Sequence, residues 1–102
     1  MDLPEFARKV EKHFLQNESE TKREHVYRQV IKLQEEVGEL SEAILGEFGG
    51  QYNPKKDVGE VDKELVDIMI VVHMIANIMK IDLKEAQRKK VAELVERFDL
   101  KM

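Results

Sequence analysis

Few residues in this chain can form the tight turns that a β-sheet needs. Its 102 residues contain five Gly and two Pro, and one of the prolines is Pro4, close to the N-terminus. Apolar residues instead recur at helical spacing along most of the chain. These features predict an all-α fold. Because the length is that of one domain, we expect residues 1–102 to form a single four-helix bundle.

The four expected helices are bounded by residues that favour helix ends. They cover approximately residues 4–15, 19–48 or 21–48, 57–80 and 82–98. Ser19 or Thr21, Asp57 and Asp82 are suited to the N-cap position. The pair Gly49-Gly50 is suited to end the second helix.

Composition and charge exclude several classes of protein. The chain has 17 basic and 21 acidic residues, a formal net charge of −4, which argues against general nucleic-acid binding by phosphate neutralisation. It has no Cys, and therefore no disulfide and no thiolate zinc site. The longest apolar run is Ile68–Val72, far short of the ~20 residues that cross a bilayer. Since the first residues also lack a signal-peptide pattern, we expect a cytoplasmic protein without a membrane partner.

The second helix carries three acidic residues beside an apolar stripe. A helical projection places Glu36 at the border of this stripe, Glu39 just outside it, and Glu35 furthest from it. We therefore expect Glu35 to be a solvated charge. The stripe, which we expect to face the core, consists of Val26, Val30, Leu33, Val37, Leu40, Ile44 and Phe48.

The third helix has carboxylates on its core-facing side. Glu64 and Asp67 share a face with Val71, Met74 and Ile78, which are apolar. Burying an isolated charge costs several kcal/mol or more, so carboxylates in this position have to be paired, neutralised or bound to a cation.

Antiparallel packing of the second and third helices would bring these acids together. Glu36 and Glu39 would then approach Glu64 and Asp67, and ligands that are all oxygen suit Mg²⁺ or Mn²⁺ rather than zinc. The alternative is a charged end of the bundle, in which Lys32 and Lys63 balance the acids.

These acids and their neighbours resemble a known family. The segment Glu35-Glu36-Val37-Gly38-Glu39-Leu40, followed by Glu64-Leu65-Val66-Asp67, is similar to the EExxE…ExxD signature of the MazG-like, all-α nucleoside triphosphate pyrophosphohydrolases. The resemblance extends to Lys32-Leu33 before the signature, Ser41-Glu42-Ala43 after it, and the segment from Asp82 to Phe98. It covers about the last 80 residues.

The resemblance implies an activity and a set of site residues. The reaction is cleavage between the α- and β-phosphates of a nucleoside triphosphate, giving a monophosphate and pyrophosphate, in the usual role of nucleotide-pool house-cleaning. By position, Glu36, Glu39, Glu64 and Asp67 correspond to the ligands of Mg²⁺, for which Mn²⁺ can substitute. Glu35 corresponds to the remaining signature acid, which is expected to orient or activate the attacking water, so that Glu35, Glu36 and Glu39 form the expected catalytic set. The basic residues expected to bind substrate phosphates are Lys32, Lys89 and Arg97.

Some positions depart from the family pattern and leave the substrate open. Members often have Asn where this chain has Met74, and basic or Asn residues where it has Val91 and Glu93. Canonical deoxynucleotides, altered nucleotides, dUTP and dCTP all remain open. Two alternative functions also remain: a phosphoribosyl-ATP pyrophosphatase, and a non-catalytic helical interaction module, which would not need acids on an apolar face.

The third helix also predicts self-association. Its residues from Leu65 to Met79 are apolar around most of the circumference, and three neighbouring helices of a small chain can hardly cover such a surface. We therefore expect at least a homodimer, and the family resemblance implies a dimer or a dimer of dimers.

Overall fold

The computed structural model describes residues 1–14, 21–50 and 59–101. Over these ranges the chain forms four helices and no strand, which confirms the all-α prediction: α1 (Leu3–Phe14), α2 (Lys22–Glu47), α3 (Val61–Ile78) and α4 (Leu83–Arg97). The predicted caps at Ser19 and Asp57 lie outside the described residues. No described helix is both long enough and apolar enough to cross a membrane.

Side chains and a glycine set the helix ends, as the sequence predicts. The Thr21 hydroxyl and the Asp82 carboxylate each accept a hydrogen bond of 3.1 Å from the backbone N–H three residues later, at the starts of α2 and α4. At the end of α2, Gly49 has a φ of 74°, and the N–H of Gly50 donates to the carbonyl of Leu45 at 2.8 Å. This closing turn needs a left-handed residue, which Gly provides without a steric penalty.

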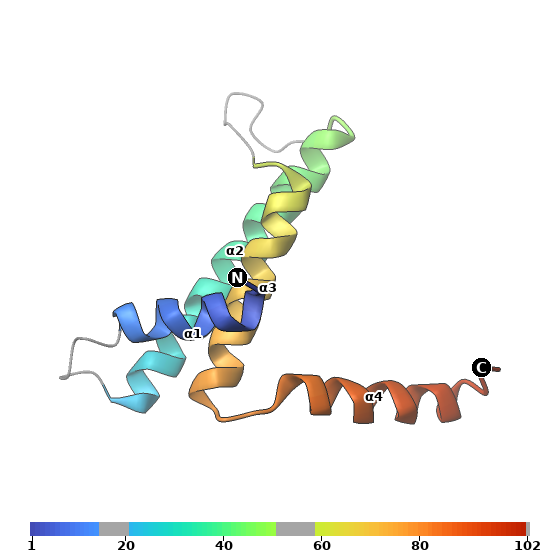
Figure 1. Ribbon diagram of the computed structural model, residues 1–102. Coiled ribbons are helices and arrows are strands. Elements are labelled where there is room, and N and C mark those ends of the chain that lie inside the picture. The colour runs from blue at the N-terminus through green and yellow to red at the C-terminus, as the bar shows by residue number, and fades with distance from the viewer. Residues whose placement is uncertain (15–20, 51–58, 102) are drawn as a thin grey trace.

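Helix α3 is the centre of the fold. It packs antiparallel to α2 and also contacts α1, which crosses the α2–α3 pair (Figure 1). The buried apolar residues are Ala7, Ala43, Val71, Met74, Ala76 and Ile78. Four of these six belong to α3, and three of them form the stripe predicted next to Glu64 and Asp67.

The face of α2 that packs against α3 is not the predicted apolar stripe. The buried residues of α2 are His25, Gln29, Glu36 and Ala43. Within the predicted stripe, Val30, Val37, Ile44 and Phe48 are exposed instead. The prediction that this stripe faces the core of one chain is therefore wrong: α2 turns its polar edge toward α3 and leaves its apolar stripe on the surface.

Helix α4 does not complete a packed four-helix bundle. It extends away from the other three helices (Figure 1) and makes no extensive contact with α1, α2 or α3 in the described parts of the chain. The turn before α4 contains Lys80 at φ 57°, and the N–H of Ile81 donates to the carbonyl of Ala76 at 2.8 Å. This turn directs α4 outward, so the arrangement is three packed helices and one projecting helix.

Candidate metal and nucleotide site

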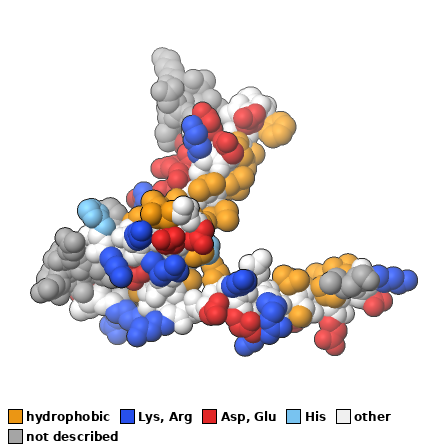
Figure 2. Space-filling view, in the orientation of Figure 1, with side chains coloured by type: hydrophobic (Ala, Val, Ile, Leu, Met, Phe, Trp, Pro, Cys, Tyr) orange, Lys and Arg blue, Asp and Glu red, His pale blue; other side chains and the backbone are white. Residues whose placement is uncertain are grey.

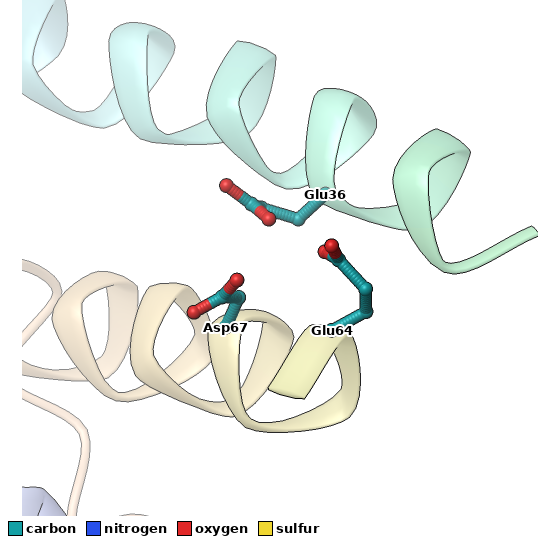
Figure 3. Close-up of side chains that lie close together, drawn as sticks. All are labelled: Glu36, Glu64 and Asp67. Atoms are coloured by element: carbon teal, nitrogen blue, oxygen red, sulfur yellow. The ribbon is translucent and has the colours of Figure 1, made fainter. Parts of the chain in front are cut away.

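Three carboxylates meet where the middle of α2 faces the first turns of α3. Glu36 comes from α2, and Glu64 and Asp67 come from α3, one turn apart. All three point toward the space between the two helices (Figure 3), and one oxygen of each lies within 4.8 Å of the other two. The antiparallel packing therefore brings together three of the four predicted metal ligands.

Two of these carboxylates are buried, and each has an oxygen for which no described residue offsets the free-energy cost of burial. Glu36 is 6% exposed and Glu64 is 8% exposed. Oε2 of each is buried and has no hydrogen-bond partner within the described residues. Buried oxygens that carry negative charge and lack donors are strongly unfavourable, and a cation between them would remove most of this penalty. The donor set, oxygen only, fits Mg²⁺ or Mn²⁺.

Lys32 provides one positive charge beside the three acids. Its Nζ lies 3.1 Å from Oε1 of Glu36 and 3.7 Å from Oε2 of Glu35. The hydrogen bond and the charge of Glu36 raise the pKa of Lys32, so this ammonium group stays charged at neutral pH. One cation facing Glu36, Glu64 and Asp67 leaves a net negative charge at the site.

Glu39 lies at the edge of this group. It is exposed, and it is not one of the three residues whose carboxylate oxygens lie within 4.8 Å of one another. The negative charge of Glu36, followed by burial and the charge of Glu64, nevertheless raises the pKa of Glu39. This shift places Glu39 within the electrostatic reach of both buried acids. Its assignment as a metal ligand stays a prediction.

Glu35 lies on the solvent side of α2, as the helical projection predicts. It is exposed, and Lys32 is its partner at 3.7 Å. Its assignment as the acid that orients water stays a prediction.

The two basic residues predicted on α4 do not reach the acids of their own chain. Lys89 and Arg97 are both exposed on the projecting helix, and Nη2 of Arg97 lies 3.0 Å from Oε1 of Glu93. Helix α4 leaves the three-helix body, so these side chains lie away from the acidic group of their own chain (Figure 1).

A cavity of about 390 Å³ opens beside the acids. Glu36 and Asp67 line one end of it, and Gln29, Val10 and Met74 lie further along. Lys32 lines the wall in between. The cavity thus begins at the acidic group and continues into an apolar space between α1, α2 and α3.

Two residues near the acids were not predicted from the sequence. Gln29 is 7% exposed and lies seven positions before Glu36, on the same face of α2. Gly59 lies so close to the Glu64 carboxylate that a Cβ at this position would overlap it. The position of Gln29 could have been predicted, because its seven-residue spacing from Glu36 places both residues on one face of α2. Nothing in the sequence indicates the contact between Gly59 and Glu64.

The fold and the site define a class: an all-α protein whose antiparallel helices hold an acidic group suited to a divalent cation. The family model of the MazG nucleotide pyrophosphohydrolase domain matches residues 25–99, which include all three acids and α4. The chain therefore belongs to the MazG family, and the resemblance seen in the signature residues is confirmed. No curated protein and no solved structure gives a significant match to the chain.

Proposed function

We propose that this chain is a Mg²⁺-dependent nucleoside triphosphate pyrophosphohydrolase. It would cleave the bond between the α- and β-phosphates of ribo- or deoxynucleoside triphosphates, giving a monophosphate and pyrophosphate, in the house-cleaning of nucleotide pools. The observation that carries the proposal is the convergence of Glu36, Glu64 and Asp67, with two buried oxygens that lack partners, in a chain of the MazG family. Residues 1–102 would act as a single catalytic domain.

The cation would be held by Glu36, Glu64 and Asp67. Glu39, at the edge of this acidic group, would be the fourth ligand. When bound, Mg²⁺ supplies charge neutralisation at the phosphate oxygens and makes a nearby water more acidic. The carboxylates are already turned toward one another, so little rearrangement of this chain is needed to bind a cation (Figure 3). Pre-positioned charges of this kind act on the transition state without a cost of reorganisation.

Glu39 is the acid best placed to take the proton of the attacking water. It is exposed, and the charges of Glu36 and Glu64 raise its pKa, which moves it toward the range where a carboxylate works well as a general base. In the reaction, the water oxygen bonds to the α-phosphorus, the bridging P–O bond to the β-phosphate breaks, and the water proton goes to Glu39. Glu35 would instead help to hold Lys32.

Lys32 would contact the phosphates of the substrate. Its side chain is half exposed at the boundary between the acids and the cavity. A lysine acts on phosphate as a point charge and needs no bidentate geometry, so it can contact a phosphate oxygen while remaining close to Glu36.

We also propose that two copies of the chain associate, as a homodimer or a dimer of dimers. Hydrophobic side chains lie exposed along the α2–α3 pair and on α4 (Figure 2). They include Val30, Val37 and Ile44 of α2, Leu65, Met69 and Val72 of α3, and Val91 of α4, with Phe98 and Leu100 just after it. Packing between two chains would bury these residues, and α4 would then carry Lys89 and Arg97 toward the acids of the partner subunit.

The main test of the activity is pyrophosphate release from a panel of nucleoside triphosphates with Mg²⁺. We expect turnover by the wild type and loss of at least about 100-fold in Glu39→Gln. Glu47→Gln is the matched control, because Glu47 is an exposed acid of the same helix outside the acidic group. If the wild type cleaved no triphosphate, phosphoribosyl-ATP would be tested next. Failure there, together with no stabilisation by Mg²⁺, would favour an interaction module.

The contribution of a second subunit can be tested by mixing two inactive variants. Glu64→Gln lacks a site acid, and Arg97→Ala lacks the basic residue on α4. If Arg97 acts in the partner's site, mixed dimers contain one complete site and regain activity, up to about a quarter of the wild-type value for random mixing. A monomer at micromolar concentration in sedimentation, or no recovery on mixing, would contradict this part of the proposal.

A further inference from the structure

The cavity beside the acids has two chemically different ends. Glu36 and Asp67 line the end nearer the first turns of α3, and the other end is lined by Val10, Ile70 and Met74 together with two polar side chains of α2, Arg28 and Gln29. A mostly apolar pocket with a few well-placed polar groups is typical of a site for an organic ligand. The volume of about 390 Å³ is at the small end of the range for such sites.

On both α2 and α3, the residues that line the two ends of the cavity are seven positions apart. Gln29 precedes Glu36 by seven residues on α2, and Met74 follows Asp67 by seven residues on α3. Seven residues are about two helical turns, or a rise of about 10.5 Å, and return to the same face. Because the helices are antiparallel, Gln29 and Met74 lie at the same end, about 10 Å along the cavity from the acids.

Gln29 is mostly buried in the wall of this cavity. It is 7% exposed, and it lines the cavity together with apolar residues of α1 and α3. A primary amide has both donor and acceptor atoms. An amide in this position is well suited to bind a ligand that brings a matching donor and acceptor.

We propose that Gln29 determines base recognition: the nucleobase of the substrate occupies the apolar end of this cavity, and the Gln29 amide hydrogen-bonds to its edge. This inference rests on the proposed function, because that function places the phosphates at Lys32 and the acids. Along α2, the order is then Gln29 for the base, Lys32 for the phosphates and Glu36 for the cation, at spacings of about one turn each.

Met74 forms part of the wall against which the base packs. It is buried, lies on the acid-bearing face of α3, and lines the same cavity as Gln29. A methionine adapts its shape and makes favourable contacts with aromatic rings. The apolar Met74 therefore contacts the face of the base, and the polar Gln29 contacts its edge.

The test is binding of uncleavable α,β-methylene nucleoside triphosphates that differ in the base, compared with inorganic tripolyphosphate, which has no base. All titrations contain Mg²⁺ and use calorimetry. We expect Gln29→Leu to weaken the best-bound analogue by about 10- to 100-fold and to leave tripolyphosphate unchanged. Gln34→Leu, the same change at an exposed position of α2, is the control and should alter neither.

A second variant separates recognition from folding. Met74→Ala removes atoms from the same cavity without changing the amide, and should also weaken the analogues but not tripolyphosphate. Equal losses for both probes, or no loss in either variant, would overturn the proposal. Since the analogues are not cleaved, a failure of the wild type to hydrolyse triphosphates would count against the proposed function alone and leave this binding test intact.

Discussion

Nζ of Lys32 lies 3.1 Å from Oε1 of Glu36, one turn away on the same helix. The pair links the half-exposed wall of the cavity to the most buried acid of α2. It satisfies one oxygen of Glu36 and leaves Oε2 without a partner among the described residues. The lysine therefore offsets part of the negative charge of the acidic group, but it does not replace a cation between Glu36, Glu64 and Asp67.

Replacing Lys32 with Met should destabilise the metal-free protein by up to about 1 kcal/mol, since the lysine end of the pair is half exposed and screened by water. The loss should shrink in saturating Mg²⁺, because a bound cation then compensates the charge of Glu36. Thermal unfolding in EDTA and in Mg²⁺ measures both values. Lys63→Met is the control, because Lys63 forms a comparable exposed pair with Glu60 at 3.3 Å. Equal effects of the two substitutions would show that Lys32 has no special relation to the site.

Replacing Glu64 with Gln should stabilise the metal-free protein while abolishing its response to Mg²⁺. Glu64 is buried beside two other carboxylates, and no described residue forms an ion pair with it, so the neutral amide relieves repulsion. We expect a gain of about 1 kcal/mol, or roughly 4–8 °C in Tm for a domain of this size. Differential scanning calorimetry with EDTA and then with Mg²⁺ tests both parts. A lower Tm in EDTA would mean that Glu64 contributes to folding rather than to cation binding.

The sequence predicts the helices and the acid-bearing face of α3 because both depend on local periodicity. Thr21 and Asp82 cap the helices as expected, and the face shared by Glu64, Val71 and Met74 is buried. The face of α2 could not be predicted in the same way. Periodicity shows that Val30, Val37 and Ile44 form an apolar stripe, but not whether the stripe is buried within one chain or against a second one.

The positions of Lys89 and Arg97 could not be predicted from spacing either. Their distance from the acids depends on the direction of α4, which a short turn containing Lys80 at φ 57° determines. A small change in this turn moves the end of a 15-residue helix by many ångströms. Local sequence patterns carry little information about such a rotation.

Replacing Gly59 with Ala should weaken cation binding with little effect on folding. A Cβ at this position would overlap the Glu64 carboxylate, so that carboxylate has to move. Because it is the flexible end of a side chain, the move costs the fold little, but it displaces one of the three site acids. We expect about a tenfold higher Kd for Mn²⁺ and a change in unfolding free energy within about 0.5 kcal/mol. Gly38→Ala, at a glycine with open space around it, is the control. An unchanged Kd would show that Glu64 has room to bind in another rotamer.

The stability of the metal-free protein should fall as pH rises through the titration of Glu39. The charge of Glu36, then burial and the charge of Glu64, raise the pKa of Glu39 above its ordinary value. Between the ordinary and the raised value, the folded state binds more protons than the unfolded state, so the free energy of unfolding decreases with pH.

Two measurements test this dependence. Tm in EDTA from about pH 4 to pH 7 should decline less steeply in Glu39→Gln than in the wild type, since the variant lacks the titrating group. In the wild type, the Kd for Mg²⁺ should rise as pH falls, and this rise should begin above the pH at which an ordinary glutamate is protonated. Protons and the cation then compete for the same carboxylates. Identical pH profiles for the wild type and Glu39→Gln would place Glu39 outside the electrostatic field of the acidic group, and would remove the support for its role as general base.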